Sequence, residues 1–228
     1  MLADQTPFRS GWWSFGLPGY RPCDATYCHF PYESLPPLDD IRFQGDFSWL
    51  TPLDAGLSHA ADDEPAEVQV HLRALVAEVE LHGLSLPHAF LTFMRDPILH
   101  ARMPSCTACY FDLPGHLTPS PFGDAAYVIR FLNDQQWLLL WHLYLRRDGE
   151  HCVVVSHAPY DELDWYLSED EEPRTLEQVR QETWWCASSF EAFLYRFWRE
   201  NRLWYALTKR HSTSLSDAER AYLQYFPP

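Results

Sequence analysis

Three dense apolar segments between Tyr127 and Ser156 constrain most strongly what this chain can fold into. They are separated by Asn133-Asp134 and by Asp148-Gly149, and an Asp-Gly pair favours a tight hairpin because glycine accepts a positive φ. The central segment is apolar on both faces of a strand, so it needs cover on both sides. The pattern predicts a β-meander with strands at Tyr127–Leu132, Gln136–Leu145 and Glu150–Ser156.

Helices are expected before and after the meander. Apolar residues follow a 3.6-residue spacing from Pro65 to His82, which predicts an amphipathic helix. A second, shorter helix is expected after Pro87, limited by Pro97. Three capping-box sequences predict further helix starts at Thr175, Ser188 and Ser216. The first of these helices is expected to run through Trp184 and Trp185.

These elements predict an α+β fold in which helices pack on an antiparallel meander. Residues 1–60 are rich in aromatic residues and proline, and we expect an N-terminal extension that packs on the α+β domain at 61–228. Residues 39–50 suggest one or two short strands around Gly45, and Asp54–Glu67 reads as a linker. CTACYFDLPG, residues 106–115, suggests a strand that ends at a Pro-Gly turn.

The formal net charge of −15 restricts the class of partner. Phosphate binding needs clustered cations, so nucleic acid and anionic membranes are not expected partners. A basic protein is the natural complement, although acidity also keeps an aromatic-rich chain soluble. The N-terminal residues show no signal peptide, and the longest apolar run is too short to span a bilayer. A cytoplasmic location with mostly reduced cysteines is therefore expected.

Cys106-x-x-Cys109 is the sharpest chemical motif in the chain. Two thiolates at this spacing can hold zinc, but a structural site needs four ligands, for which Cys23, Cys28 and His29 are candidates. A redox role needs a cysteine at a helix N-terminus, whereas a strand-like sequence follows here. The simplest interpretation is that both cysteines are small apolar core residues. Hence no cofactor is expected, and zinc is the alternative.

No recognised catalytic motif accompanies these cysteines. The sequence has no nucleophile elbow, phosphate-binding loop or HExxH zinc motif. His142, His151 and His157 lack a paired nucleophile or carboxylate motif, so structural roles are expected for them. The chain is therefore expected not to be an enzyme. A zinc- or thiol-dependent enzyme built on Cys106 and Cys109 is the alternative.

An acidic segment interleaved with aromatic residues follows the meander. Charge runs are usually solvated loops, yet aromatic rings among carboxylates suit a protein interface, where rings anchor and charges steer. The residues predicted to bind a partner are Asp161, Glu162, Asp164, Trp165, Tyr166, Glu169, Asp170, Glu171 and Glu172.

The order of these pieces resembles the SMI1/KNR4 family of the SUKH superfamily. The resembling pieces are the amphipathic helix, the Leu-Pro-led LSLPHAFLTFM, the meander and the late SSFEAFLYRFW segment. The resemblance implies a SUKH-like α+β fold and a binding role. Many members are bacterial immunity proteins that neutralise toxins, often nucleases, and others are regulatory or scaffold proteins. We therefore expect a protein-binding module, with an immunity protein against a basic toxin as the main reading and a regulatory scaffold as an alternative.

Overall fold

The computed structural model describes residues 7–38, 43–54, 56–62, 64–160, 175–208 and 215–226. The helices are α1 (Pro65–Leu81), α2 (His88–Arg95), α3 (Pro97–His100), α4 (Leu176–Gln181), α5 (Phe190–Leu207) and α6 (Asp217–Gln224), with a 3-10 turn at Tyr32–Ser34. The strands are β1 (Arg9–Ser10), β2 (Trp12–Ser14), β3 (Cys28–Phe30), β4 (Ala61–Asp62), β5 (Tyr110–Phe111), β6 (Thr118–Pro119), β7 (Tyr127–Asn133), β8 (Leu140–Leu145), β9 (His151–Ser156) and β10 (Thr183–Ala187).

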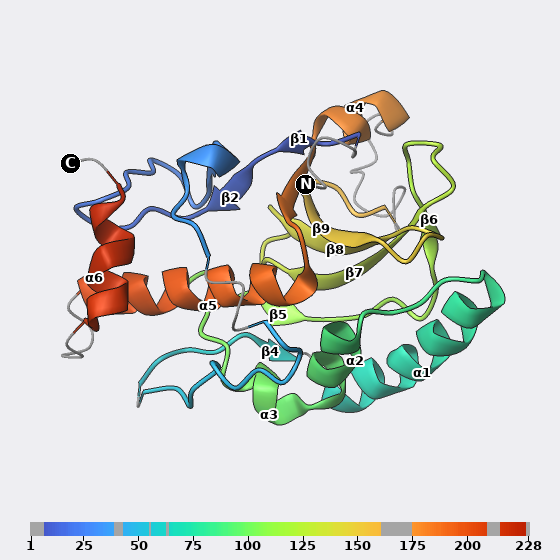
Figure 1. Cartoon of the computed structure of the whole chain (residues 1–228), viewed down its shortest axis with the longest axis horizontal. Helices are drawn as coiled ribbons and strands as arrows, with labels where there is room; N and C mark the ends of the chain where they lie inside the picture. The colour runs from blue at the N-terminus through green and yellow to red at the C-terminus, as the bar shows by residue number, and fades with distance from the viewer. Residues whose placement is uncertain are drawn as a thin grey trace.

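One mixed sheet organises the molecule (Figure 1). Its strand order is β1-β10-β9-β8-β7-β5-β4, and β6 pairs with β7 beside β5. The pairings from β10 to β7 are antiparallel, whereas β1 and β4 join the two ends in parallel. β2 and β3 form a separate two-stranded sheet. The fold is therefore α+β with a mostly antiparallel sheet, as the sequence predicted.

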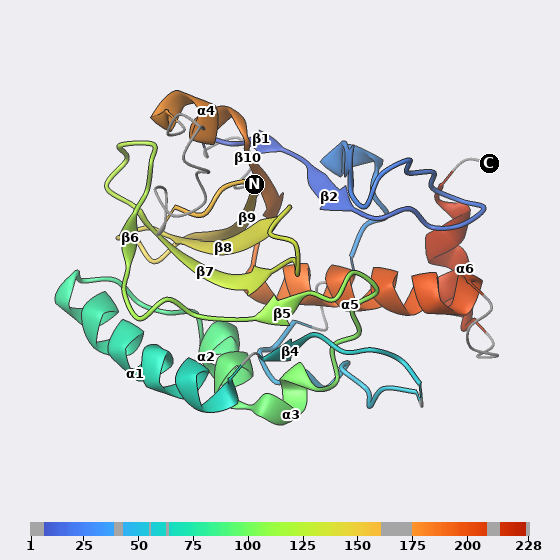
Figure 2. The same cartoon turned by 180° about the vertical axis from the view of Figure 1, so that it is seen from behind.

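Helices and the N-terminal segment cover the two faces of this sheet. On one face, Phe190 of α5 packs 5.0 Å from both Phe90 of α2 and Phe131 of β7, measured between ring centroids. On the other face, Phe8 lies 5.0 Å from Tyr144 and shares a cluster with Val179 of α4. Figure 2 shows α4 on the opposite side of the sheet from α5, α2 and α1. Burial on both faces explains the apolar character of β8.

The meander is present, but its central strand begins later than predicted. β8 starts at Leu140 rather than Gln136, because residues 134–139 form a turn. The Asp134 carboxylate accepts hydrogen bonds from the amides of Gln136 (2.9 Å) and Leu138 (3.3 Å). Trp137 takes a φ of 58° inside this turn, a backbone conformation that residues other than glycine rarely adopt.

The predicted first helix is confirmed as α1, which ends as Gly83 takes a φ of 67°. The second is confirmed as α2, which begins directly after Pro87. Pro97 does stop α2, but it also starts α3, because Asp96 caps the new helix by accepting from the Ile98 amide. A proline is well tolerated in the first turn of a helix.

Two predictions around residues 175–191 are wrong. Trp184 and Trp185 lie in strand β10 rather than in a helix, because α4 ends at Gln181 and the next residues pair with β9. The cap of α5 is Ser189 rather than Ser188, and Ser189 accepts from the amide of Ala192. The capping boxes at Thr175 and Ser216 are confirmed, with both reciprocal hydrogen bonds formed.

Three N-terminal and central segments also differ from expectation. Residues 43–50 form bends and turns rather than strands, with Gly45 and Phe47 at positive φ. The expected linker contains β4, which pairs with β5. In residues 106–115 only Tyr110–Phe111 is a strand, since Ala108 has a φ of 54° and turns the chain between the two cysteines. Within the described ranges, no helix is both long and apolar enough to cross a membrane.

Candidate functional site

The acidic segment predicted to bind a partner lies outside the described residues. All nine of its predicted binding residues fall between 161 and 174: Asp161, Glu162, Asp164, Trp165, Tyr166, Glu169, Asp170, Glu171 and Glu172. The candidate sites that the structure does describe are therefore built from other residues.

Cys106 and Cys109 lie in a tightly hydrogen-bonded turn. The Cys106 amide donates to Asn201 Oδ1 of α5 at 2.7 Å, and the Cys109 amide donates to Ser105 Oγ at 2.7 Å. Burial raises the pKa of both thiols, that of Cys109 to about 11. Raised pKa values disfavour the thiolate that both metal binding and nucleophilic attack require.

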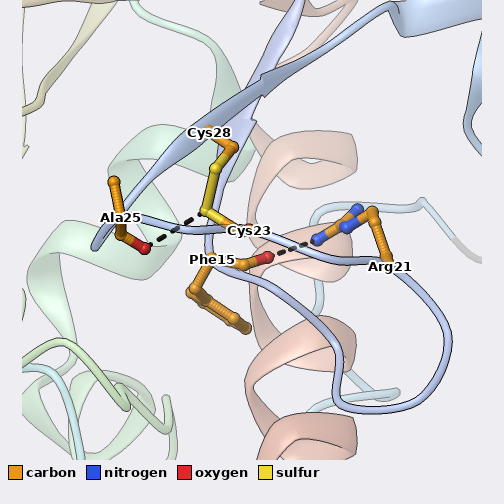
Figure 3. Close-up of a disulfide and its surroundings, with 5 residues drawn as sticks. All are labelled: Phe15, Arg21, Cys23, Ala25 and Cys28. Carbon is orange, nitrogen blue, oxygen red and sulfur yellow. Dashed lines mark hydrogen bonds between the residues drawn. A yellow bond between two sulfur atoms is a disulfide. The ribbon is translucent and has the colours of Figure 1, made fainter.

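Cys23 and Cys28, the proposed further zinc ligands, form a disulfide with each other (Figure 3). A disulfide sulfur is not a thiolate ligand, so this pair does not complete a zinc site with Cys106 and Cys109. Cys23 Sγ lies 3.2 Å from the Ala25 carbonyl oxygen. A disulfide sulfur carries no hydrogen, so this contact can become a hydrogen bond only when the disulfide is reduced to thiols. Among the residues described, no three His, Cys, Asp or Glu side chains are placed to hold a metal ion.

Cys23 of the disulfide and Cys106 both line a surface cavity of about 720 Å³. The loop from Phe15 to Thr26 forms most of the lining, and Thr107 and Trp204 complete it. The half-buried Cys106 thiol is the one free cysteine of the described residues that is not fully buried. This cavity, called here the N-terminal loop cavity, offers few charged groups.

A polar cluster centred on the Glu200 carboxylate shares Arg21 with the lining of this cavity. Glu200 of α5 is buried and accepts hydrogen bonds from Trp12, Ser14, Arg21 and Tyr222. Burial alone would raise its pKa, but the Arg21 guanidinium overrides that effect and lowers the pKa to about 2. Strongly shifted pKa values often mark functional sites. Here the carboxylate is 1% exposed and saturated with donors, so the cluster is structural and joins the N-terminal segment to α5 and α6.

A second cavity, of about 530 Å³, lies between α1 and the chain from Tyr110 to His116. We call it the α1 cavity. Its charged lining comes from Glu64 at the N-cap of α1, from Glu67 in the first turn, and from an ion pair between Arg130 and Asp112, whose Nη1 and Oδ2 atoms are 3.0 Å apart. His71 also lines it and contacts the carbonyl oxygen of Leu113 at 2.6 Å. The sequence reasoning missed this site, because its parts come from a helix, a connecting loop and a strand.

The histidines singled out in the sequence do not form a common site in the described structure. His142 is buried beside Tyr160, at 4.4 Å between ring centroids, and neither of its ring nitrogens has a hydrogen-bond partner among the described residues. Burial and the nearby Arg130 charge hold its pKa well below the usual value. His157 contacts Trp13 and Trp184 at the surface, and burial lowers the pKa of His151.

The exposed charges of the described residues are mainly negative. Arg21, Arg130, Arg146 and Arg202 are each paired with carboxylates of the same chain. Exposed carboxylates are more widely spread and include Asp24, Glu33, Asp46, Glu64, Glu67, Glu80, Asp124, Asp148, Glu177 and Asp217. Comparison of the chain with protein-family models, curated proteins and solved structures gives no match.

Proposed function

We propose that this chain is a non-enzymatic protein-binding module whose partner is a basic protein. The observation that carries the proposal is the distribution of charge among the described residues. Arg21 and Arg130 are buried in ion pairs, and exposed carboxylates outnumber the exposed arginines, which are Arg9, Arg73, Arg95, Arg147 and Arg220. Such a surface attracts a basic partner over long range and raises its association rate by roughly one to three orders of magnitude at low salt.

The state of the cysteines supports a binding role over a thiol or zinc enzyme. A thiol enzyme needs a lowered pKa at an accessible cysteine, whereas burial raises the pKa of Cys106 and Cys109. A zinc enzyme needs at least three protein ligands. Cys23 and Cys28 are engaged in a disulfide, which removes two of the three further ligands that the sequence offered.

The narrower form of the proposal is a SUKH-like immunity protein that covers the active site of a basic toxin such as a nuclease. The order of α1, α2, the meander and α5 supports it, since the sequence resembles the SMI1/KNR4 family in that same order. A regulatory scaffold of the same family type would share the fold and the charge but would have no toxin partner.

Affinity capture from the source cells tests the proposal, followed by reconstitution with the purified partner. A supporting result is a stoichiometric complex with a basic protein whose association slows at least about tenfold between roughly 0.05 and 0.5 M salt. Binding that is indifferent to salt, or a neutral or acidic partner, would overturn it. Protection of cells that express the captured partner separates immunity from scaffolding.

A further inference from the structure

We propose that the α1 cavity receives an arginine side chain of the basic partner. This inference rests on the proposed function and assigns its contact site to the hollow between α1 and the β5–β6 connection. The two segments run side by side in both views of the fold (Figures 1 and 2). Three properties of the cavity carry the inference: its fixed hydrogen-bond acceptors, its net charge and its mixed walls.

The first property is a pair of acceptors that face each other without a donor between them. A carbonyl oxygen can only accept, so the 2.6 Å contact between His71 Nδ1 and the Leu113 oxygen requires that Nδ1 carries the hydrogen. In the neutral ring, Nε2 is then an acceptor, and it lies 3.8 Å from Glu67 Oε1. An N–H donor placed at this edge of the cavity would satisfy both atoms.

The second property is negative charge that nothing in the cavity neutralises. Arg130 is the one cation in the lining, its side chain is 3% exposed, and its charge is offset by Asp112 at 3.0 Å. Glu64 and Glu67 are both exposed at the rim, and among the described residues neither carboxylate forms an ion pair with an arginine or lysine. An anionic ligand would meet these two carboxylates, so the cavity selects a cation.

The third property is the shape and chemistry of the walls. The acceptors follow the first two turns of α1, from Glu64 at its N-cap through Glu67 to His71, and a planar guanidinium carries five donors that can engage two neighbouring acceptors at once. Leu113 and Pro114 supply apolar wall on the facing side, suited to the methylene stem of the same side chain. A lysine ammonium is a compact donor that would engage fewer of these groups.

A peptide titration tests the site directly. The probe is acetyl-Gly-Arg-Gly-amide, with the citrulline peptide as an uncharged control of nearly the same shape. The readout is the ¹⁵N resonance of His71 Nε2 in histidine-labelled full-length chain, assigned with His71→Gln. We expect a saturable shift with the arginine peptide and none with citrulline. Equal shifts with both peptides, or no saturable shift with arginine, would overturn the assignment.

A matched pair of variants separates the cavity from general electrostatics. Glu67→Gln should weaken arginine binding roughly three- to fivefold, the range of a part-exposed ion pair. Glu80→Gln removes the same charge from the same helix, but it lies roughly 20 Å along the axis, beyond the Debye length of about 8 Å at physiological salt. It should change binding less than about 1.5-fold. Equal losses in the two variants would overturn the cavity assignment and leave the proposed function standing. A failed partner capture combined with saturable, arginine-selective peptide binding would overturn the proposed function and leave the cavity as a site for arginine alone.

Discussion

Arg21 and Glu200 lie 179 residues apart and form a buried, two-pronged ion pair. Arg21 Nη1 is 2.8 Å from Glu200 Oε1, and Nη2 is 2.7 Å from Oε2. Trp12, Ser14 and Tyr222 donate to the same carboxylate. The N-terminal segment, α5 and α6 are therefore held together at one group, whose charge is fully compensated by its neighbours.

Glu200→Gln should reduce the free energy of unfolding by about 3–5 kcal/mol, because it leaves the Arg21 charge buried without its counter-charge. Equilibrium urea unfolding measures the change. Glu80→Gln, an exposed glutamate of α1, is the control and should lie within about 0.5 kcal/mol of the parent chain. A loss below about 1 kcal/mol for Glu200→Gln would show that the cluster contributes little to stability.

The elements that the sequence predicted well are those with local causes. α1 follows from apolar spacing and a terminal glycine, and the capping boxes at Thr175 and Ser216 depend on side chains three residues apart. The meander follows from dense apolar runs separated by turn residues. None of these features needs knowledge of a distant part of the chain.

The elements that were missed depend on distant residues. Trp184 and Trp185 have a sequence that suits either a helix or a strand, and pairing with Val155 and Val154 of β9 decides for the strand. Glu191 fits a capping box by spacing, but it bonds to the Gly45 amide and Trp49 Nε1 instead. The α1 cavity combines Glu67 with Asp112 and Arg130, and no local pattern places these three together.

Acidification below about pH 6.5 should destabilise the chain through His142. The pKa of this buried ring is lowered in the folded chain, so the unfolded chain binds a proton first and stability falls as the pH drops below the ordinary value of 6.5. The limit for one such group is about 1.4 kcal/mol per pH unit, or roughly 2 kcal/mol between pH 6.5 and 5.

His142→Leu should remove this dependence, so that its unfolding free energy changes less than that of the parent chain between pH 6.5 and 5. Urea unfolding at three or four pH values in this range gives the comparison. The exposed His116 provides the control, and His116→Gln should retain the slope of the parent chain. An unchanged slope in His142→Leu would assign the acid sensitivity to other groups.

Reduction of the Cys23–Cys28 disulfide should lower the thermal midpoint by roughly 4–8 °C. Closing a loop of this length restricts the unfolded chain by about 2 kcal/mol, and a domain of this size shifts by about 2–4 °C per kcal/mol. Differential scanning calorimetry with and without a dithiol reductant measures the effect. The double variant Cys23→Ser, Cys28→Ser should have the thermal midpoint of the reduced protein, and reductant should not change it. Cys106→Ser should show the same decrease on reduction as the parent chain.

The thiols at Cys106 and Cys109 should react slowly with a disulfide reagent in the folded chain at pH 8. Burial raises the pKa of Cys109 from 9.0 to about 11, which lowers its thiolate fraction by roughly a hundredfold. Burial raises the pKa of Cys106 as well, but Cys106 is the one free cysteine of the described residues that is not fully buried. Because the reagent can reach it, Cys106 should react before Cys109, Cys152 and Cys186.

Stopped-flow labelling measures the rate of thiol reaction in the native chain and in the urea-unfolded chain. Cys106→Ser should abolish the fastest phase of the native reaction. Because thiol-dependent catalysis requires an accessible thiolate, slow labelling at both positions agrees with a binding module. A Cys106 that labels faster in the folded chain than in urea would contradict the raised pKa. It would also favour the thiol-enzyme alternative over the proposed binding function.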